Sequence, residues 1–408
     1  KAFDSYPHQL SGGQRQRAMI AQSISLEPRV LVADEPTTAL DVTVQAEILD
    51  LLRNLHTKLD SAIILITHDM GVVADMADDV MVMKDGDVVE YGPASQVFGE
   101  AEHPYTRALM ASVPHLGLGE ARTEEATHRD DSTAALRLEN VSIEYPKRGR
   151  VPAFRAVSDA TLSIQPGEVL GLVGESGSGK TTIARAIVGL VPIAEGSLRV
   201  AGQDMVGVGP KELRAVRRKL GIVFQDPGSS LNPRWPVGES IGEPLELAGR
   251  ERKEISKRVE DLLDLVELPR DFRNRYPHEL SGGQRQRIGI ARALALDPTV
   301  LVADEPTSAL DVSVQARVLE LLQAIQKEKQ FATLFVTHDL AVVDLLADRI
   351  AVMQHGRIVE QGTKEQILRN PQDDYTKRLI AAVPVPDPAE QRQRREARAA
   401  LLAEQKSA

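Results

Sequence analysis

The run LSGGQRQR stands at residues 280–287, and the same eight letters stand at residues 10–17. Other chemically important residues recur at the same offset, and the pairs are Asp34 with Asp304, Glu35 with Glu305, and His68 with His338. A repetition at one fixed offset predicts two copies of one domain joined in tandem. Only the second copy contains a glycine-rich loop, GESGSGKTT at residues 174–182. We therefore expect the first copy to lack its N-terminal part, and a chain that starts with Lys1 fits this expectation.

The composition is that of an ordinary soluble protein. The chain has 408 residues, of which 42% are hydrophobic and 26% charged, so we expect at least two globular domains. No apolar stretch approaches the roughly 18 to 20 residues that cross a bilayer. The absence of cysteine excludes disulfides and thiolate metal sites and favours a reducing cytosol. The net charge of −10 argues against nonspecific binding to nucleic acid.

A polar, acidic segment separates the two copies. The sequence GLGEARTEEATHRDDSTA has no apolar periodicity, which is typical of a flexible linker. At the other end, prolines interrupt the pattern before a tail rich in Arg and Ala, for which we expect a solvated helix. The predicted parts are the C-terminal portion of the first domain at residues 1–116, the linker at 117–134, the complete second domain at 135–385, and the tail at 386–408.

The glycine-rich loop has the pattern of a phosphate-binding loop. Residues 168–173 (EVLGLV) predict a buried strand, residues 174–180 a turn, and residues 181–190 a helix. Glycines let backbone N–H groups approach a polyphosphate, and the start of the helix adds its positive dipole end. We expect Lys180 to reach the β- and γ-phosphates and Thr181 to ligate Mg²⁺.

Two acids follow the next apolar strand, which is predicted at residues 299–303. At the carboxyl edge of a parallel sheet, beside a phosphate loop, such a pair typically holds Mg²⁺ and activates water. We expect Asp304 to hold the metal through water and Glu305 to polarise the attacking water. A helix cap ahead of Pro306 is the structural alternative, but it does not explain two buried acids. His338, after a strand predicted at residues 333–336, is expected to contact the γ-phosphate.

With these motifs, the chain resembles a pair of ATP-binding cassette (ABC) ATPase domains. The second copy carries all the family motifs, and the first copy matches from the LSGGQ signature onward. The resemblance implies an α/β fold with two P-loop ABC ATPase domains in tandem. Each is expected to have a mainly parallel sheet and a helical signature subdomain, and the second copy also an N-terminal antiparallel β region. ATP and Mg²⁺ are the implied cofactors.

The resemblance also implies the site residues. ATP is expected to lie between the phosphate loop of one domain and the signature of the other, with the D-loop aspartates nearby, through intramolecular pairing of the two ATPase domains. An aromatic residue is expected to stack on adenine, and Tyr145 is the candidate, with Phe154 as a competitor. The catalytic residues are Glu305, His338, Gln225, Glu35 and His68; the metal ligands are Thr181, Gln225 and Asp304; the nucleotide-binding residues are Gly174, Glu175, Ser176, Gly177, Ser178, Gly179, Lys180, Thr181, Thr182, Tyr145, Ser11, Gly12, Gly13, Gln14, Ser281, Gly282, Gly283, Gln284, Asp41 and Asp311.

Three segments resemble the importers of oligopeptides, dipeptides and nickel. Residues 225–234 (QDPGSSLNPR) resemble the Q-loop region of that subfamily, and HPYTR at 103–107 and DDYTK at 373–377 resemble its C-terminal extension. The resemblance implies an ATPase that powers peptide import at the cytoplasmic face of the inner membrane, as a peripheral protein. Its implied partners are two transmembrane permease subunits and an extracytoplasmic substrate-binding protein, with no nucleic acid.

The alternative function is that of a soluble tandem ABC ATPase acting on ribosomes or nucleic acid. Such translation factors carry a long, charged, helical linker, and such repair ATPases carry zinc fingers or long coiled-coil insertions. The linker here is short and there is no cysteine, which favours the importer. Neither alternative identifies the transported solute, because the ATPase motifs describe the motor and not its cargo.

Overall fold

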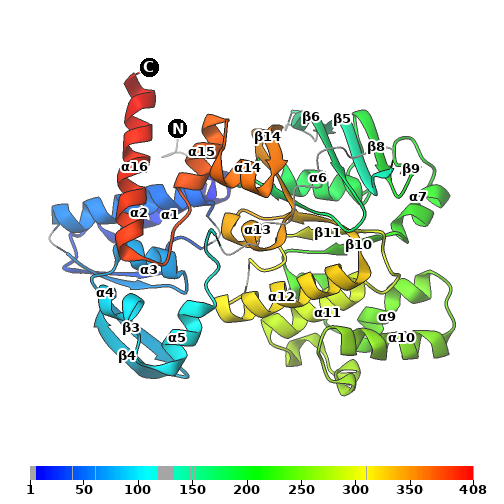
Figure 1. Ribbon diagram of the computed structural model, residues 1–408, viewed down its shortest axis with the longest axis horizontal. Helices are drawn as coiled ribbons and strands as arrows, with labels where there is room; N and C mark the ends of the chain where they lie inside the picture. The colour runs from blue at the N-terminus through cyan, green and yellow to red at the C-terminus, as the bar shows by residue number, and fades with distance from the viewer. Residues whose placement is uncertain are drawn as a thin grey trace. The chain divides into compact units, whose positions relative to one another are not determined.

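The computed structural model describes residues 6–38, 40–59, 61–117, 133–147, 149, 152–308 and 310–407. Most of the linker expected at residues 117–134 lies outside these described residues. The chain divides into two compact units (Figure 1). Unit 1 comprises residues 1–117 and 374–408, and unit 2 comprises residues 118–373.

Unit 2 contains a central six-stranded sheet with the strand order β10-β11-β12-β7-β13-β14 (Figure 1). The first five strands run parallel, and β14 pairs antiparallel with β13. Because the parallel strands share one direction, their carboxyl ends meet at a single edge, where the phosphate loop and the acidic pair follow their strands. The strands are β10 (Leu220–Val223), β11 (Val300–Asp304), β12 (Ala332–Val336), β7 (Val169–Val173), β13 (Arg349–Gln354) and β14 (Arg357–Thr363).

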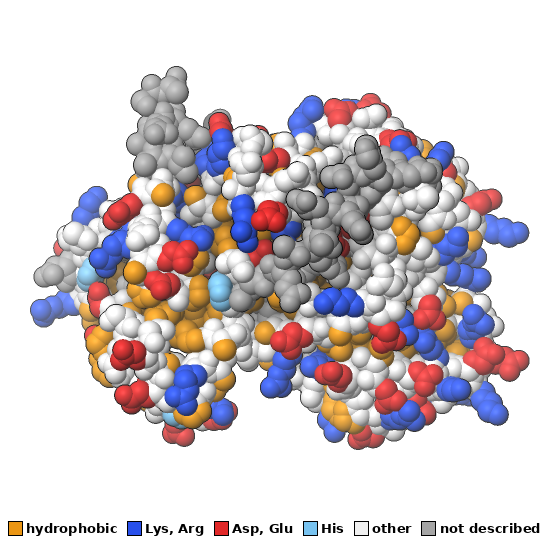
Figure 2. All heavy atoms as spheres, viewed as in Figure 1, with side chains coloured by type: hydrophobic (Ala, Val, Ile, Leu, Met, Phe, Trp, Pro, Cys, Tyr) orange, Lys and Arg blue, Asp and Glu red, His pale blue; other side chains and the backbone are white. Residues whose placement is uncertain are grey.

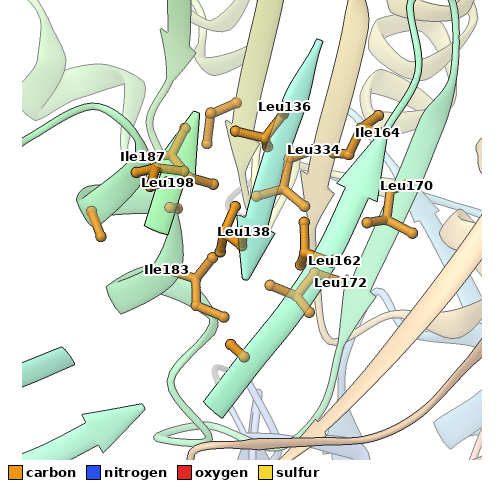
Figure 3. Packing of buried hydrophobic residues seen from close by; sticks show 14 of the residues in the cluster. Leu136, Leu138, Leu162, Ile164, Leu170, Leu172, Ile183, Ile187, Leu198 and Leu334 are labelled. Atoms are coloured by element: carbon orange, nitrogen blue, oxygen red, sulfur yellow. The ribbon is translucent and has the colours of Figure 1, made fainter. Parts of the chain in front are cut away.

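A four-stranded antiparallel sheet, in the order β6-β5-β8-β9, forms the second layer of unit 2. Helix α6 (Lys180–Ile187) contacts strands of both sheets, so its apolar residues fill the space between them. Figure 3 shows this core, in which ten of the side chains are labelled. Each fully buried Leu or Ile there contributes about 2 kcal/mol of hydrophobic stabilisation. The strands are β5 (Leu136–Tyr145), β6 (Phe154–Ile164), β8 (Glu195–Val200) and β9 (Gln203–Asp204).

Strand β7 shows why the sequence folds this way around the loop. All five of its residues are buried, as expected for a parallel strand covered on both faces. Gly171 lets helix α13 (Leu340–Leu346) approach the strand, because a Cβ there would lie 2.6 Å from a methyl carbon of Val343. The predicted strands and helix around the loop are thus confirmed, with ends that differ from the prediction by at most three residues.

A group of helices in unit 2 surrounds the LSGGQ run at residues 280–287. Helix α11 begins immediately after Ser281 and packs against α8, α9, α10 and α12, as well as against strand β10. The remaining helical elements of unit 2, in which η denotes a 3₁₀ helix, are α7 (Pro210–Arg217), α8 (Pro227–Ser230), α9 (Val237–Leu247), α10 (Arg252–Leu265), η4 (Arg270–Asn274), η5 (Pro277–Glu279), α11 (Gly282–Ala293), α12 (Val312–Lys329) and α14 (Lys364–Arg369).

Unit 1 contains two small sheets, each of two strands. Strands β1 and β2 are parallel, and β3 and β4 are antiparallel. Helix α2 packs between the signature helix α1 and the C-terminal segment. The elements are η2 (Pro7–Gln9), α1 (Gly12–Ser23), β1 (Val30–Asp34), α2 (Val42–Leu59), β2 (Ala62–Ile66), α3 (Met70–Met76), β3 (Asp79–Lys84), β4 (Asp87–Pro93), α4 (Ala94–Gly99), α5 (Pro104–Ala111), α15 (Asp374–Ala381) and α16 (Pro388–Ser407).

The parallel pair β1 and β2 does not form the interior of a nucleotide-binding domain. Its residues alternate between exposed and partly buried, whereas every residue of β11 and β12 in unit 2 is buried. Within the described residues of unit 1, no strand precedes a phosphate loop. The expected fold of two ATPase domains is therefore found once, in unit 2.

The C-terminal tail differs from its prediction in one respect. It is helical, as expected, but α16 is not surrounded by solvent, because it packs against α15, α3 and α4 within unit 1. This docking could not be predicted from sequence periodicity, because α16 contacts α3 and α4, which lie far from it in the sequence.

The surface carries charges of both signs. Among the described residues on the face shown in Figure 2, basic and acidic side chains are interspersed, and they form no continuous basic stripe. Over the residues that the structure describes, no helix has both the length and the apolar composition needed to span a membrane.

Candidate active site

The phosphate loop joins β7 to α6 through backbone conformations that favour glycine. Gly174, Gly177 and Gly179 have φ angles of 148°, 79° and 108°. A Cβ on Gly174 would lie 2.1 Å from the Met353 carbonyl oxygen, so this loop is packed closely against the end of β13. The left-handed conformation and the close approach together explain why glycine stands there.

Lys180 is the first residue of α6 and is 5% exposed. Its ammonium donates to the carbonyl oxygens of Gly174 at 2.7 Å and Glu175 at 2.9 Å. These bonds hold the positive charge across the mouth of the loop. A buried ammonium so placed is suited to a polyphosphate, which supplies further acceptors and compensating charge.

The loop also contains an unused donor. The Ser178 hydroxyl is buried and has no hydrogen-bond partner among the described residues. An orphaned buried hydroxyl costs free energy unless a ligand accepts from it. Together with the glycines and the ammonium, this hydroxyl fits the phosphate groups of a nucleotide.

Thr181 and Asp304 meet across the sheet edge. The Thr181 hydroxyl donates to Oδ1 of Asp304 at 3.1 Å, which brings the loop to the end of β11. Asp304 is 7% exposed, and this burial raises the pKa of its carboxyl group despite the bond from Thr181. Hydroxyl and carboxylate oxygens are the ligands that Mg²⁺ prefers. A bound cation would also favour the ionised carboxylate, so the donor set fits Mg²⁺.

Glu305 lies at the centre of a second group of side chains. The Gln225 amide donates to Oε2 of Glu305 at 2.9 Å, and Nδ1 of His338 lies 3.4 Å from Oε1. Glu305 has a left-handed φ of 47°, which costs about 1–2 kcal/mol for a side chain other than glycine. Its N–H donates to the Val336 carbonyl at 2.8 Å, and this bond helps to hold the strained position. Gln225 and His338, which come from two separate segments, therefore fix one carboxylate.

The ionisation of this pair follows from its surroundings. Burial raises the pKa of Glu305, but the hydrogen bond and charge of His338 and the charge of Lys180 outweigh it, so the pKa is lowered overall. Burial lowers the pKa of His338, but the bond and charge of Glu305 outweigh that effect, so this pKa is raised. Glu305 is thus ready to act as a base at neutral pH.

We expect the stability contributed by this pair to depend on pH. The raised pKa of His338 gives stabilisation that is complete below its ordinary value of 6.5 and is lost as pH rises through the raised value. The lowered pKa of Glu305 gives stabilisation that is complete above 4.5 and is lost as pH falls through the lowered value. A His338→Gln variant should therefore lose most unfolding free energy, relative to the wild type, between about pH 5 and 6. Chemical denaturation across a pH series measures this, and a loss independent of pH would contradict it.

Tyr145 and Phe154 both remain candidates for the adenine contact. They lie opposite each other at the paired ends of β5 and β6. The Tyr145 hydroxyl is 3.4 Å from that of Thr182, so its ring is near the phosphate loop. Phe154 is more exposed, at 62% against 37% for Tyr145. The contact with Thr182 favours Tyr145.

The two signature runs form identical helix N-termini. In each run the serine hydroxyl accepts from the glutamine N–H at 3.3 Å, and the glutamine side chain accepts from the serine N–H at 3.0 Å. This reciprocal capping box satisfies the N–H groups of the serine and the glutamine, and the N–H groups of the two glycines between them have no intrahelical acceptor. Such an end is suited to an anion. The residues are Ser11, Gly12, Gly13 and Gln14 before and within α1, and Ser281, Gly282, Gly283 and Gln284 before and within α11.

The aspartates of the two D-loops differ in their surroundings. Asp41 is 9% exposed, and its Oδ1 accepts from the Val44 N–H at 3.0 Å. Asp311 is exposed and precedes α12 without a side-chain cap bond. The structure therefore gives Asp41 a helix-capping role and presents Asp311 to solvent.

Unit 1 contains a counterpart of the glutamate–histidine pair. Nδ1 of His68 lies 2.7 Å from Oε1 of Glu35, and the Thr38 hydroxyl donates to Oε2 at 2.6 Å. Burial raises the pKa of Glu35, but the bonds from Thr38 and His68 outweigh it and lower the pKa overall. Asp34 is exposed, unlike the buried Asp304. The pair is present, but the described residues of unit 1 give it no phosphate loop.

Sequence reasoning missed the support that β13 and β14 give to the loop. The Gly356 N–H donates to the Ser178 carbonyl at 2.9 Å, and the Ser158 N–H donates to the Gly356 carbonyl at 2.8 Å. Gly356 has a φ of 80° in the tight turn after β13. The His-Gly pair at residues 355 and 356 is a turn signal, but the sequence does not indicate that this turn contacts the loop.

Comparison with protein families identifies two of them in this chain. The family described as ABC transporter matches residues 1–38 and 157–308. The family described as oligopeptide/dipeptide transporter, C-terminal region, matches residues 89–137 and 359–407.

Individual proteins are similar over nearly the whole chain. The glutathione import ATP-binding protein GsiA of Escherichia coli O6:H1 is 47% identical over 415 residues, which cover 96% of this chain and 67% of that protein. The protein of the same name from Shigella flexneri is 46% identical with the same coverage. Among solved structures, dimeric MJ0796, a bacterial ABC transporter cassette, aligns with a TM-score of 0.52 and 33% identity over 56% of this chain and 98% of that one. A dimeric post-hydrolysis state of MJ0796 bound to ADP and Pi gives a TM-score of 0.51.

These comparisons correct the predicted domain number. They support one nucleotide-binding domain with the C-terminal region of the peptide transporters, so the prediction of two ABC ATPase domains in tandem is wrong. A whole cassette aligns with little more than half of this chain. The physical reason is that a signature, an acidic pair and a histidine do not make a nucleotide site without the loop that binds the phosphates.

Proposed function

Because the chain belongs to the ATP-binding proteins of the ABC importers for oligopeptides, dipeptides and glutathione, we propose that it powers uptake of small peptides of the glutathione class. The match of residues 359–407 to the C-terminal region of oligopeptide/dipeptide transporters carries this proposal. The chain is an ABC transporter ATPase, which hydrolyses ATP.

We assign the chemistry of hydrolysis to unit 2. Lys180 and the loop N–H groups bind the β- and γ-phosphates, and the buried Ser178 hydroxyl donates to a phosphate oxygen. Thr181 and Asp304 would hold Mg²⁺, which when bound neutralises charge on the phosphates. Glu305 orients a water molecule and accepts its proton, because its lowered pKa keeps it ionised at neutral pH.

His338 and Gln225 complete this assignment. The ring of His338 stabilises the Glu305 carboxylate and is placed to donate to the γ-phosphate. Gln225 connects Glu305 to the surface, since it follows Phe224, which is 38% exposed. A structural change at Phe224 would therefore be transmitted to the base through one hydrogen bond.

A signature helix is proposed to bind the γ-phosphate from the side opposite Lys180. The dimeric state of the similar cassettes supports such an arrangement. The chain offers two capped N-termini for this role, at Ser11 and at Ser281. Separate Ser11→Ala and Ser281→Ala variants identify which one contributes, because only the contributing serine should lower the rate of turnover when it is replaced.

A groove beside Gln225 is the proposed docking site for a cytoplasmic helix of a permease subunit. It has a volume of about 380 Å³ and a mainly apolar lining that includes Leu190, Ile222 and Phe224, with Arg217 and Arg292 at polar positions. An amphipathic helix would place its apolar face in such a groove. This position supports coupling of transport to hydrolysis, because Phe224 is adjacent to the glutamine that contacts Glu305.

An affinity purification tests these proposed partners. The tagged protein is isolated from detergent-solubilised membranes of its host, and the retained proteins are identified by mass spectrometry. We expect two multi-spanning permease subunits, whose retention a Phe224→Asp variant should weaken. Recovery of ribosomal or DNA-repair proteins without membrane proteins would contradict the importer function.

A further inference from the structure

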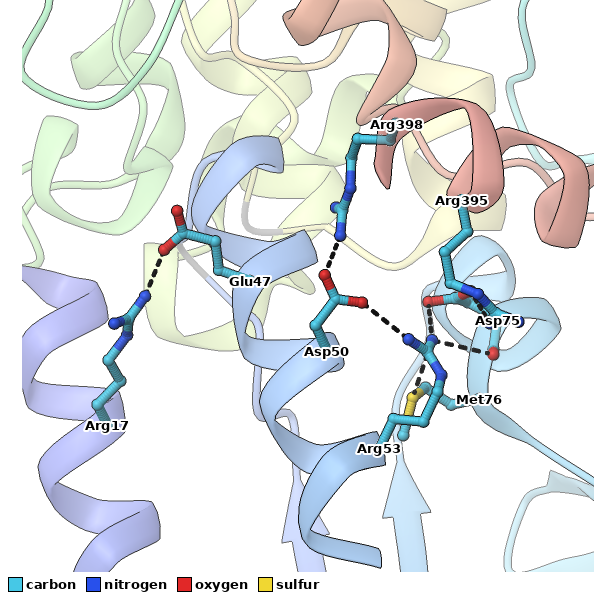
Figure 4. A network of polar contacts seen from close by, with 8 residues as sticks. All are labelled: Arg17, Glu47, Asp50, Arg53, Asp75, Met76, Arg395 and Arg398. Carbon is cyan, nitrogen blue, oxygen red and sulfur yellow. Dashed lines mark hydrogen bonds and ion pairs between the residues drawn. The ribbon is translucent and has the colours of Figure 1, made fainter. Parts of the chain in front are cut away.

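Helix α16 is attached to helices α2 and α3 of the same unit by an alternating row of charged side chains (Figure 4). Arg395 lies 3.1 Å from Asp75 at the end of α3, and Arg398 pairs with Asp50 on α2. Arg53 lies between the two acids, 2.8 Å from Asp50 and 2.6 Å from Asp75. Three arginines thus share two carboxylates.

Burial gives this row more weight than an ordinary surface ion pair. The side chains of Asp75 and Arg398 are 6% and 14% exposed, and the other three members of the row are 28–40% exposed, so the burial is concentrated at Asp75. A buried carboxylate is costly unless it is paired, and surface pairs contribute little by comparison. Asp75 also accepts from Arg53, so loss of Arg395 removes one of its two cationic partners. The row therefore favours the docked position of α16.

One of the two acceptors, Asp75, and the arginine between the acceptors, Arg53, are specific to unit 1. The corresponding helices of unit 2 are α12 and α13, which carry Glu320, Gln323 and Leu345 where α2 and α3 carry Asp50, Arg53 and Asp75. An apolar leucine and a neutral glutamine cannot build the alternating row. The charged residues of α2 and α3 thus complement the arginines of α16, and they stand at positions where α2 and α3 differ from α12 and α13.

Helix α2 contacts the signature helix as well as the tail. Figure 4 shows Glu47 directed toward Arg17 of α1, while Asp50, one turn along, is directed toward Arg398. At the start of α1, a Cβ on Gly13 would lie 2.5 Å from a methyl carbon of Val44, so the signature run is packed directly on α2. Any movement of α2 must therefore move the capped N-terminus at Ser11.

We propose that α16 is an intrachain latch, in which Arg398 holds α2 through Asp50 and Arg395 holds α3 through Asp75, so that these two positioning residues fix the N-terminus of the signature helix α1. The latch itself stands on the contacts within unit 1. Its effect on turnover rests on the proposed function of the signature run at Ser11.

Hydrogen exchange on the whole protein tests the latch. The variant Arg395→Gln with Arg398→Gln keeps helix-forming residues of similar length, and Arg392→Gln is the matched control, because Arg392 is exposed on the same helix. We expect amides of α2 and α3 to exchange about tenfold faster in the double variant, and amides of β7 and α6 to be unchanged. Replacement of both arginines by lysine should restore much of the protection. Equal protection of α2 and α3 in the double variant and the control would overturn the latch.

The kinetics of ATP hydrolysis test the positioning role. The double variant should turn over about tenfold more slowly at an unchanged KM, since the phosphate loop lies in unit 2 and its contacts are not altered. Faster exchange with normal turnover would overturn the positioning role. In that case a Ser11→Ala variant locates the failure. Normal turnover of this variant means that the signature run at Ser11 does not contribute to hydrolysis, and reduced turnover means that the run contributes but the latch does not control it.

Discussion

The Glu305→Gln variant is expected to bind ATP as the wild type does but to hydrolyse it about 10² to 10⁴ times more slowly. Glutamine keeps the shape and the bond to Gln225 but cannot accept a proton from water. The loss should fall on kcat, because the hydrogen bonds that hold Lys180 in the phosphate loop do not involve Glu305. Single-turnover hydrolysis, with a separate titration of nucleotide binding, measures both quantities.

A matched control shows that the effect is specific. Glu195→Gln removes an exposed glutamate of the same unit, which pairs with Arg155 at the surface. This control should hydrolyse ATP at the wild-type rate. Undiminished turnover by Glu305→Gln would contradict the assignment of Glu305 as the base.

The Lys180→Met variant is expected to bind ATP about 10 to 100 times more weakly. Methionine replaces the apolar stem of the buried lysine but has no ammonium to bond phosphate oxygens. Hydrogen bonds from a charged donor are the strongest ones at such a site. Removal of the ammonium should therefore lower the affinity for ATP more than removal of any neutral donor in the loop. Titration with a fluorescent ATP analogue measures the dissociation constant.

The control for this variant is Lys253→Met, which removes an exposed lysine on α10 of the same unit. Its affinity for ATP should equal that of the wild type. An unchanged affinity in Lys180→Met would show that the loop at residues 174–182 does not bind the phosphates.

The local parts of the site could be predicted from the sequence because their causes are local. A buried strand, three glycines and a helix start specify the phosphate loop within a few residues of one another, and the structure places Lys180 at its mouth. The acidic pair Asp304 and Glu305 could be predicted equally well, since it directly follows an apolar strand. The resemblance to ABC ATPases added Gln225, which the structure bonds to Glu305.

The parts that could not be predicted depend on contacts between distant segments. The repeated LSGGQ run predicted two ATPase domains, but a repeated motif does not guarantee a complete sheet around it, and β1 and β2 remain alternately exposed. The docking of α16 was missed because Arg395 and Asp75 lie far apart in the sequence. The contact of Gly356 with the phosphate loop was missed for the same reason.

Peptide uptake by living cells tests the central claim most directly. Host cells that lack the gene are supplied with the wild-type protein or with Glu305→Gln, and the uptake of radiolabelled glutathione and of a labelled dipeptide is followed over time. We expect the wild-type protein to restore uptake of at least one of these peptides and Glu305→Gln to restore none. Equal uptake with the two proteins, or uptake of neither peptide by cells that produce the wild-type protein, would contradict the proposal that ATP hydrolysis at this site drives peptide import.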